Sequence, residues 1–124
     1  MGRQKRIRPG DRGKRTIVRD HTGKAHDCDS KMEARRLMQL DLAGYRVERE
    51  GLKIPYTFEG KRHYYLPDLL VYNYAGRLVR VEECKPRVRQ GDAINQAKWA
   101  AARLWCKSQG VDFWVVNENE LGKL

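Results

Sequence analysis

The sequence predicts a single α/β domain in which helices flank a mixed β-sheet. Two segments carry helical periodicity, near residues 30–42 and 93–108, and several short β-rich runs lie between them. A compact apolar run at 111–116 follows the second helix. This order of helix, antiparallel strands, helix and strand is typical of helices packed on a mixed sheet, and 124 residues suffice for one core.

The N-terminal segment, residues 1–15, is polar, basic and glycine-containing, and we expect it to be a flexible arm preceding a domain at 16–124. Thr16–Arg19 has strand character, and Ala25–Cys28 can return as its partner after a turn.

The first helix is expected to start at a capping box, with Ser30 as N-cap and Glu33 reaching back to it, and to end before Gly44. Glu33, Leu37 and Leu40 share one face of that helix. Glu33 therefore has two compatible roles. It caps the helix, or it points along the apolar face towards other acidic residues.

Strands are expected at 45–50, 52–58 and 62–66, followed by a hairpin that joins 68–72 to 78–85 through a glycine-containing turn. Asp92 is a candidate N-cap for the second helix. The predicted buried stripe of that helix is Ile94, Ala97, Ala101, Leu104, Trp105 and Ser108. The run Val111–Val116 is expected to be a buried strand.

The charge balance favours an anionic partner, with DNA as the first candidate. Lys and Arg number 26 against 16 Asp and Glu, a formal net charge of +10, and residues 1–19 alone contribute +7. No apolar run is long enough to span a membrane, and the N-terminus has no secretory h-region. Three widely spaced cysteines indicate a reducing compartment, so we expect the cytoplasm of a bacterial or phage-infected cell.

The hairpin formed by 68–72 and 78–85 contains most of the candidate catalytic residues. Side chains alternate along a strand, so Val79, Val81, Glu83 and Lys85 are expected on one inward face. Asp68 starts the partner strand beside them. Two carboxylates brought together at a buried face favour a hard divalent cation such as Mg²⁺, which prefers oxygen ligands.

The joint pattern of Glu33 on a helix, Pro67-Asp68 on a strand and Glu83-Cys84-Lys85 on the next strand resembles the PD-(D/E)xK nuclease superfamily. Its restriction-endonuclease-like fold is a mixed sheet flanked by helices. From Ser30 to Leu121 the chain is most similar to TnsA-type transposon endonuclease domains and phage endonuclease I-type Holliday-junction resolvases.

The resemblance implies a Mg²⁺-dependent DNA endonuclease acting on branched or structured DNA, with Mn²⁺ as a substitute metal. Asp68, Glu83, the Cys84 carbonyl and Glu33 would hold the metal. Lys85 would orient the attacking water or stabilise negative charge, with Gln96 as an auxiliary residue. A resolvase would also require a homodimer. The basic side chains expected to bind the DNA backbone are Arg3, Lys5, Arg6, Arg8, Arg12, Lys14 and Arg15.

Alternatives stay open at this stage. Glu82 is expected to face away as a solvated partner of Arg80 or a helix, but a one-residue bulge would make it the ligand instead of Glu83. His21, His26 and Cys28 allow a zinc interpretation, although they supply only one thiol and no Cys pair. The whole protein could instead be a non-catalytic DNA-binding module, or a TnsA-like subunit working with a transposase. His63, Tyr64 and Tyr65 precede Asp68, and strand packing is their default role.

Overall fold

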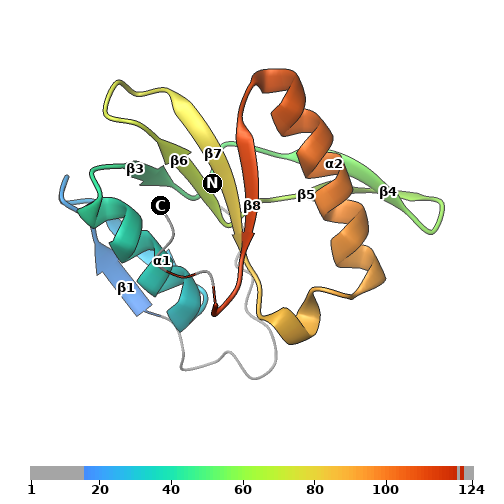
Figure 1. Ribbon diagram of the computed structural model, residues 1–124, viewed down its shortest axis with the longest axis horizontal. Coiled ribbons are helices and arrows are strands. Elements are labelled where there is room, and N and C mark those ends of the chain that lie inside the picture. The colour runs from blue at the N-terminus through green and yellow to red at the C-terminus, as the bar shows by residue number, and fades with distance from the viewer. Residues whose placement is uncertain (1–15, 120, 122–124) are drawn as a thin grey trace.

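A four-stranded mixed sheet with a helix on each face forms the centre of the molecule (Figure 1). The computed structural model describes residues 16–119 and 121, and the elements below are those of this part of the chain. The helices are α1 (Lys31–Leu42), the short 3₁₀ helix η1 (Arg87–Arg89) and α2 (Ala93–Gln109). The strands are β1 (Thr16–Arg19), β2 (Ala25–Cys28), β3 (Arg46–Glu48), β4 (Ile54–Phe58), β5 (Lys61–Tyr65), β6 (Leu69–Tyr72), β7 (Leu78–Cys84) and β8 (Asp112–Val116).

The central sheet has the strand order β3-β6-β7-β8. The first three strands pair antiparallel, whereas β8 runs parallel to β7 after the crossover through α2. The expectation of a mixed sheet flanked by helices is therefore confirmed. Two further hairpins, β1–β2 and β4–β5, form separate two-stranded sheets.

Helix α1 starts where the sequence indicates. The Ser30 hydroxyl accepts a hydrogen bond from the Glu33 backbone N–H at 3.1 Å, which satisfies one of the N–H groups left unpaired at a helix start. Gly44, at φ 93°, follows the C-cap in a conformation that favours glycine. The helix buries Leu37 and Leu40 completely against β6 and β7.

Helix α2 is rotated relative to the expected stripe. Its buried residues are Asn95, Trp99, Ala102 and Cys106, while Leu104 is 72 % exposed. The predicted stripe was partly right: Ala97, Ala101 and Trp105 pack against the core, whereas Ile94, Leu104 and Ser108 are exposed. The helix is rotated because the large Trp99 side chain is buried against β4 and β5. Asp92 occupies the N-cap position without a capping side-chain hydrogen bond.

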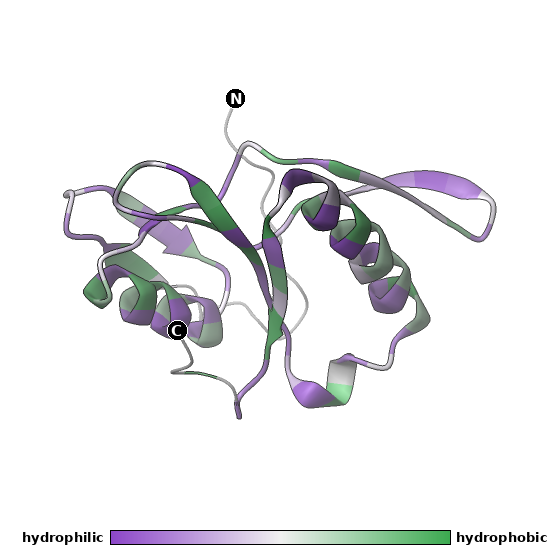
Figure 2. Cartoon of the chain, turned by 45° about the horizontal axis from the view of Figure 1, so that its top comes forward, coloured by the Kyte–Doolittle hydropathy of each residue, from purple (hydrophilic) through white to green (hydrophobic). Residues whose placement is uncertain are grey.

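The β4–β5 hairpin extends from the sheet past α2, and its far end is hydrophilic (Figures 1 and 2). Ile54, Tyr56 and Tyr65 pack against Trp99 and Ala102 of α2. The hairpin therefore completes the core on the α2 side of the sheet, whereas β1–β2 contributes Val18 and Cys28 to the core on the α1 side.

The β6–β7 hairpin contains one irregularity. Leu69 pairs with Glu82 and Leu70 with Val81, but the register shifts between Val71 and Tyr72. Because of this shift, Val79 packs in the α1-side core while Val81 packs on the α2 side, contrary to the expected shared face. Strand β8 is a sheet edge rather than a fully buried strand.

Candidate active site

Asp68 and Glu83 lie on neighbouring strands at one end of the central sheet. The pairing of Leu69 with Glu82 and Leu70 with Val81 continues one step to set Asp68 opposite Glu83. Directly opposed residues project from the same face of an antiparallel pair. Both carboxylates are almost fully buried, at 3 % and 2 % exposure. The sheet thus brings together two acids that are fifteen positions apart in the sequence.

Each of these carboxylates accepts a hydrogen bond from a buried donor. The Cys84 backbone N–H donates to Asp68 Oδ2 at 2.8 Å, and the Tyr65 hydroxyl donates to Glu83 Oε1 at 2.9 Å. Both bonds are buried, where hydrogen bonds to charged groups are strongest. The two side chains are therefore held in defined orientations before any ligand arrives.

Lys85 extends the same face of β7. Its ammonium Nζ lies 3.9 Å from Glu83 Oε2, and the side chain is almost fully buried. The Lys85 N–H donates to the Val116 carbonyl at 2.9 Å, so β8 holds the backbone beyond the end of β7. Gln90 donates from Nε2 to the Lys85 carbonyl at 3.2 Å. A buried cation is thus placed next to the Glu83 carboxylate.

The donor set suits a hard divalent cation. Mg²⁺ is commonly held by one or two carboxylates together with waters and substrate phosphate oxygens, rather than by a complete protein cage. Asp68 and Glu83 supply such a pair. No group of three or more His, Cys, Asp or Glu side chains arranged to hold a metal occurs among residues 16–119 and 121. The Cys84 thiol belongs to the α1-side core, so only its backbone adjoins the pair.

Glu33 approaches this end of the sheet from the α1 side. Its Oε1 forms a 2.5 Å ion pair with Nη2 of Arg49, and its side chain is buried. Burial raises the pKa of the Cys84 thiol well above its ordinary value, and the charges of Glu33, Glu82 and Glu83 raise it further. Cys84 is therefore a neutral thiol close to three carboxylates.

Glu82 and Glu83 point to opposite faces of β7. Glu82 is fully buried and accepts from Arg36 Nε at 2.6 Å and Nη2 at 2.9 Å, and from Arg80 Nε at 2.6 Å. The Arg80 guanidinium lies 3.8 Å from the Trp114 ring centre. The expected pairing with Arg80 and a helix is present, but the expectation of a solvated carboxylate was wrong, because α1 covers this face. The register shift lies further along the hairpin and leaves the alternation at Glu82 and Glu83 regular.

The three residues before Leu66 and Pro67 have separate environments. Tyr65 is buried with its hydroxyl on Glu83, His63 stacks on Tyr56 with ring centres 5.3 Å apart, and Tyr64 is exposed. Sequence reasoning missed the contact of Tyr65 with the acidic pair. The only signal was the alternation along β5, which places Tyr65 on the buried face with Ile54 opposite.

Gln96 lies near the surface of α2, and its Nε2 donates to the Gln90 carbonyl. The buried polar residue of this turn is its neighbour Asn95, at 3 % exposure, which sequence reasoning did not single out. Gln96 is therefore linked to Lys85 through Gln90.

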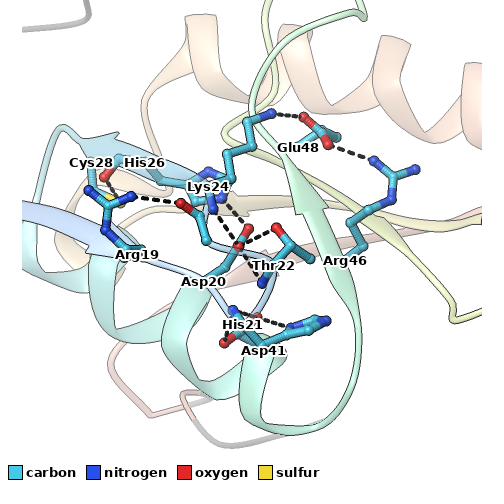
Figure 3. Close-up of polar contacts among 11 residues, drawn as sticks. Arg19, Asp20, His21, Thr22, Lys24, His26, Cys28, Asp41, Arg46 and Glu48 are labelled. Atoms are coloured by element: carbon cyan, nitrogen blue, oxygen red, sulfur yellow. Dashed lines mark hydrogen bonds and ion pairs between the residues drawn. The ribbon is translucent and has the colours of Figure 1, made fainter.

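The histidines near the β1–β2 turn are used in polar contacts with acids (Figure 3). His26 Nε2 lies 2.8 Å from Asp20 Oδ2 in a buried pair, and His21 Nδ1 lies 2.5 Å from Asp41. Burial works to raise the pKa of Asp20, but hydrogen bonds from Thr22, His26 and Lys24 hold it well below its ordinary value. The zinc interpretation of His21, His26 and Cys28 gains no support within the described residues.

The remaining expectations concern the chain as a whole. The seven basic arm residues at positions 3 to 15 lie outside the described residues. The three cysteines are free thiols and buried. In the part of the chain that the structure describes, no helix has the length and apolar character needed to cross a bilayer.

The sequence was compared with models of known protein families, and one of them matches most of the domain. A family model described as TnsA-like endonuclease N terminal matches residues 43–118, which include Asp68, Glu83 and Lys85 and begin after Glu33. No curated protein matches the chain. The match bears out the resemblance to TnsA-type nucleases drawn from the sequence motifs.

Proposed function

Because the chain belongs to the TnsA-like endonuclease N-terminal family, and is thereby a nuclease-type domain, we propose that it is a metal-dependent DNA endonuclease that hydrolyses phosphodiester bonds. We further propose branched or otherwise structured DNA as its substrate and a phage or mobile element as its source. Its site of action would be the cytoplasm of the bacterial or phage-infected cell.

One observation carries this proposal. Asp68 and Glu83 oppose each other on adjacent strands with both carboxylates buried, and the buried Lys85 ammonium lies beside Glu83. A cross-strand ion pair alone would also bring such groups together. The family match over the same residues favours the nuclease interpretation over the purely structural one.

Asp68 and Glu83 would hold the metal, Mg²⁺ with Mn²⁺ as a substitute, together with the Cys84 carbonyl. We propose that Glu33 adds a carboxylate from the α1 side, where Arg49 now neutralises it. When bound, such a cation acidifies a water and neutralises charge on the phosphate. The hydrogen bonds from Cys84 and Tyr65 keep both carboxylates oriented.

Lys85 would stabilise the negative charge that develops on the phosphate or orient the attacking water. Its ammonium is buried next to Glu83, so it needs no rearrangement from solvent during the reaction. Gln96 would act as a positioning residue through Gln90, whose side chain holds the Lys85 carbonyl.

The basic arm, residues 1–15, would bind the DNA backbone and leave residues 16–124 as the catalytic domain. Cutting two strands symmetrically would require a homodimer. These two features set substrate affinity and geometry rather than the chemical step.

The test is cleavage of supercoiled plasmid and of a four-way junction in Mg²⁺. The variants are Asp68→Asn and Glu83→Gln, and the matched controls are the exposed Asp112→Asn and Glu59→Gln. Both site variants should lose cleavage while DNA binding in EDTA stays close to wild type. A cleavage rate reduced to a few per cent corresponds to a barrier raised by about 1.5–2 kcal/mol. If either variant kept more of the wild-type rate than that, the acidic pair would not be the catalytic site.

A second candidate is a TnsA-like nuclease subunit of a transposition system, which family membership favours. It differs in needing a transposase partner for cleavage. A folded, DNA-binding chain that never cuts alone but cuts on addition of such a partner would select this second function. A chain that cuts in neither condition would be a non-catalytic DNA-binding module.

A further inference from the structure

The outer face of the β4–β5 hairpin carries an exposed aromatic ring between two cations. The register pairs Pro55 with Tyr64 and Thr57 with Arg62, so these four side chains share one face, and Lys53 continues it. All five residues are exposed, and Tyr64 is 56 % exposed. The opposite face is different, because Ile54, Tyr56 and Tyr65 are buried against α2.

Both cations lie over the same ring. Nζ of Lys53 is 5.4 Å and the guanidinium carbon of Arg62 is 5.7 Å from the Tyr64 ring centre. Two positive charges that share one aromatic ring repel each other, and an anion between them would relieve that repulsion. The outer face of the hairpin, as defined by the strand register, contains no acidic residue.

These cations differ from the basic residues near the β1–β2 hairpin. Lys24 and Arg46 both pair with Glu48 (Figure 3). Within the described part of the chain, neither Lys53 nor Arg62 makes an ion pair with a carboxylate. The hairpin therefore presents positive charge that no carboxylate of the described residues neutralises, unlike the charges of Lys24 and Arg46.

The hairpin also adjoins the acidic pair. Tyr65 follows Tyr64 directly and donates its hydroxyl to Glu83, while Asp68 is only four residues beyond Tyr64. The base of β5 is thus attached to the candidate active site, and the rest of the hairpin extends away from the sheet (Figures 1 and 2). Because neighbouring residues of a strand point to opposite faces, the outer face and the acidic pair lie on the two sides of one short segment of β5.

From these observations we propose that the outer face of β4–β5 is a DNA-binding surface for unpaired nucleotides. Lys53 and Arg62 move from the Tyr64 ring to contact phosphates, and the ring face they uncover stacks on a base. Stacking requires an exposed base face, so this surface distinguishes DNA with unpaired bases from fully paired duplex. The inference rests on the proposed function in taking DNA as the partner, and it deepens that function by naming what selects structured DNA.

The test measures binding of the full chain in EDTA, where cleavage does not contribute. Fluorescence anisotropy would follow a labelled forked DNA with single-stranded arms and a duplex of matched sequence, over a range of salt concentrations. The hairpin variant is Lys53→Gln with Arg62→Gln. The control is Arg77→Gln with Lys107→Gln, two exposed cations at the β6–β7 turn and near the end of α2.

On the forked DNA the hairpin double variant should lower the slope of log K against log salt by about 1.4, at about 0.7 for each single-strand phosphate that is no longer neutralised. The control removes the same charge and should change the slope by less than half of that. Equal slopes for the two double variants would overturn the assignment of Lys53 and Arg62 to phosphates.

Tyr64 is tested separately by Tyr64→Ala and Tyr64→Phe. Loss of one stacked base should weaken forked-DNA binding by about 5- to 150-fold in Tyr64→Ala, with little change on duplex, whereas Tyr64→Phe keeps the ring and the affinity. Equal affinity of the Ala and Phe variants for forked DNA would overturn the stacking role. Thermal melts check that each variant is folded. Failure of the proposed nuclease function would appear differently, as no cleavage by wild-type protein in Mg²⁺.

Discussion

The buried network around Glu82 gives a strong prediction for stability. Glu82 is the carboxylate that two guanidiniums share, Arg36 from α1 and Arg80 from its own strand, and all three side chains are buried. Glu82→Gln keeps the shape of the side chain and removes only its charge. The substitution therefore leaves two cations in the core without their common counter-ion.

The expected magnitude follows from this burial. Removing one partner of a buried ion pair costs about 3–5 kcal/mol, because the remaining charge has lost both its hydration and its partner. In a domain of this size, 1 kcal/mol corresponds to about 3–5 °C in Tm, so the loss should be about 9–25 °C. Domains are typically stable by about 5–15 kcal/mol, so the variant should fold but only marginally.

Urea and thermal unfolding, followed by circular dichroism, would measure this effect. The matched control is Glu59→Gln at the exposed β4–β5 turn, which should stay within about 0.5 kcal/mol of wild type. If Glu82→Gln were as stable as that control, the Arg36–Glu82–Arg80 network would not be what holds α1 on β7. The same result would also reopen the question of whether Glu82 is a metal ligand.

Three further predictions concern the proposed site and the arm. Lys85→Ala should slow cleavage by about 100-fold or more while calorimetric Mg²⁺ binding is unchanged or tighter, and near wild-type cleavage would make Lys85 a structural ion-pair partner. Tyr65→Phe removes a hydrogen bond to a buried carboxylate worth about 1.5–3 kcal/mol, so Mg²⁺ affinity or cleavage rate should fall by at least about 10-fold, and unchanged values in both titrations would assign Tyr65 to packing alone. Deleting residues 1–15 should weaken DNA binding and flatten its salt dependence by about 0.9 for each phosphate that the arm neutralises, and an unchanged slope would show that the arm does not touch DNA.

Local rules predicted most elements correctly. The Ser30 cap, Gly44 after α1 and the glycine-containing turn between β6 and β7 all reflect interactions within a few residues, which a sequence displays directly. That Asp68 lies beside the acidic end of β7 also followed from local features, namely the turn and the two strands it joins. The exact register did not: counting from the Tyr72–Leu78 pair would set Asp68 opposite Glu82, and the shift between Val71 and Tyr72 sets it opposite Glu83.

The wrong predictions concern side chains whose burial or partner depends on a segment distant in the sequence. The face that α2 buries depends on the β4–β5 hairpin, whose Tyr56 and Tyr65 receive Trp99, and no pattern inside the helix reveals that partner. Likewise, Glu82 was expected in solvent because nothing near it in sequence identifies Arg36, which is 46 residues away. The contact of Tyr65 with Glu83 was missed for the same reason. The environments of these side chains are determined by packing between distant segments, not by local propensity.

The register shift between Val71 and Tyr72 has a consequence for how this hairpin can vary in length. It separates the turn at 73–77 from the paired segment that carries Asp68 and Glu83. A one-residue insertion or deletion in that turn can be absorbed by widening or removing the bulge, since the pairing beyond it is fixed independently by α1 and β8. The loop is therefore a place where the chain can lengthen, accept a tag or diverge between relatives while the two acids keep their alignment.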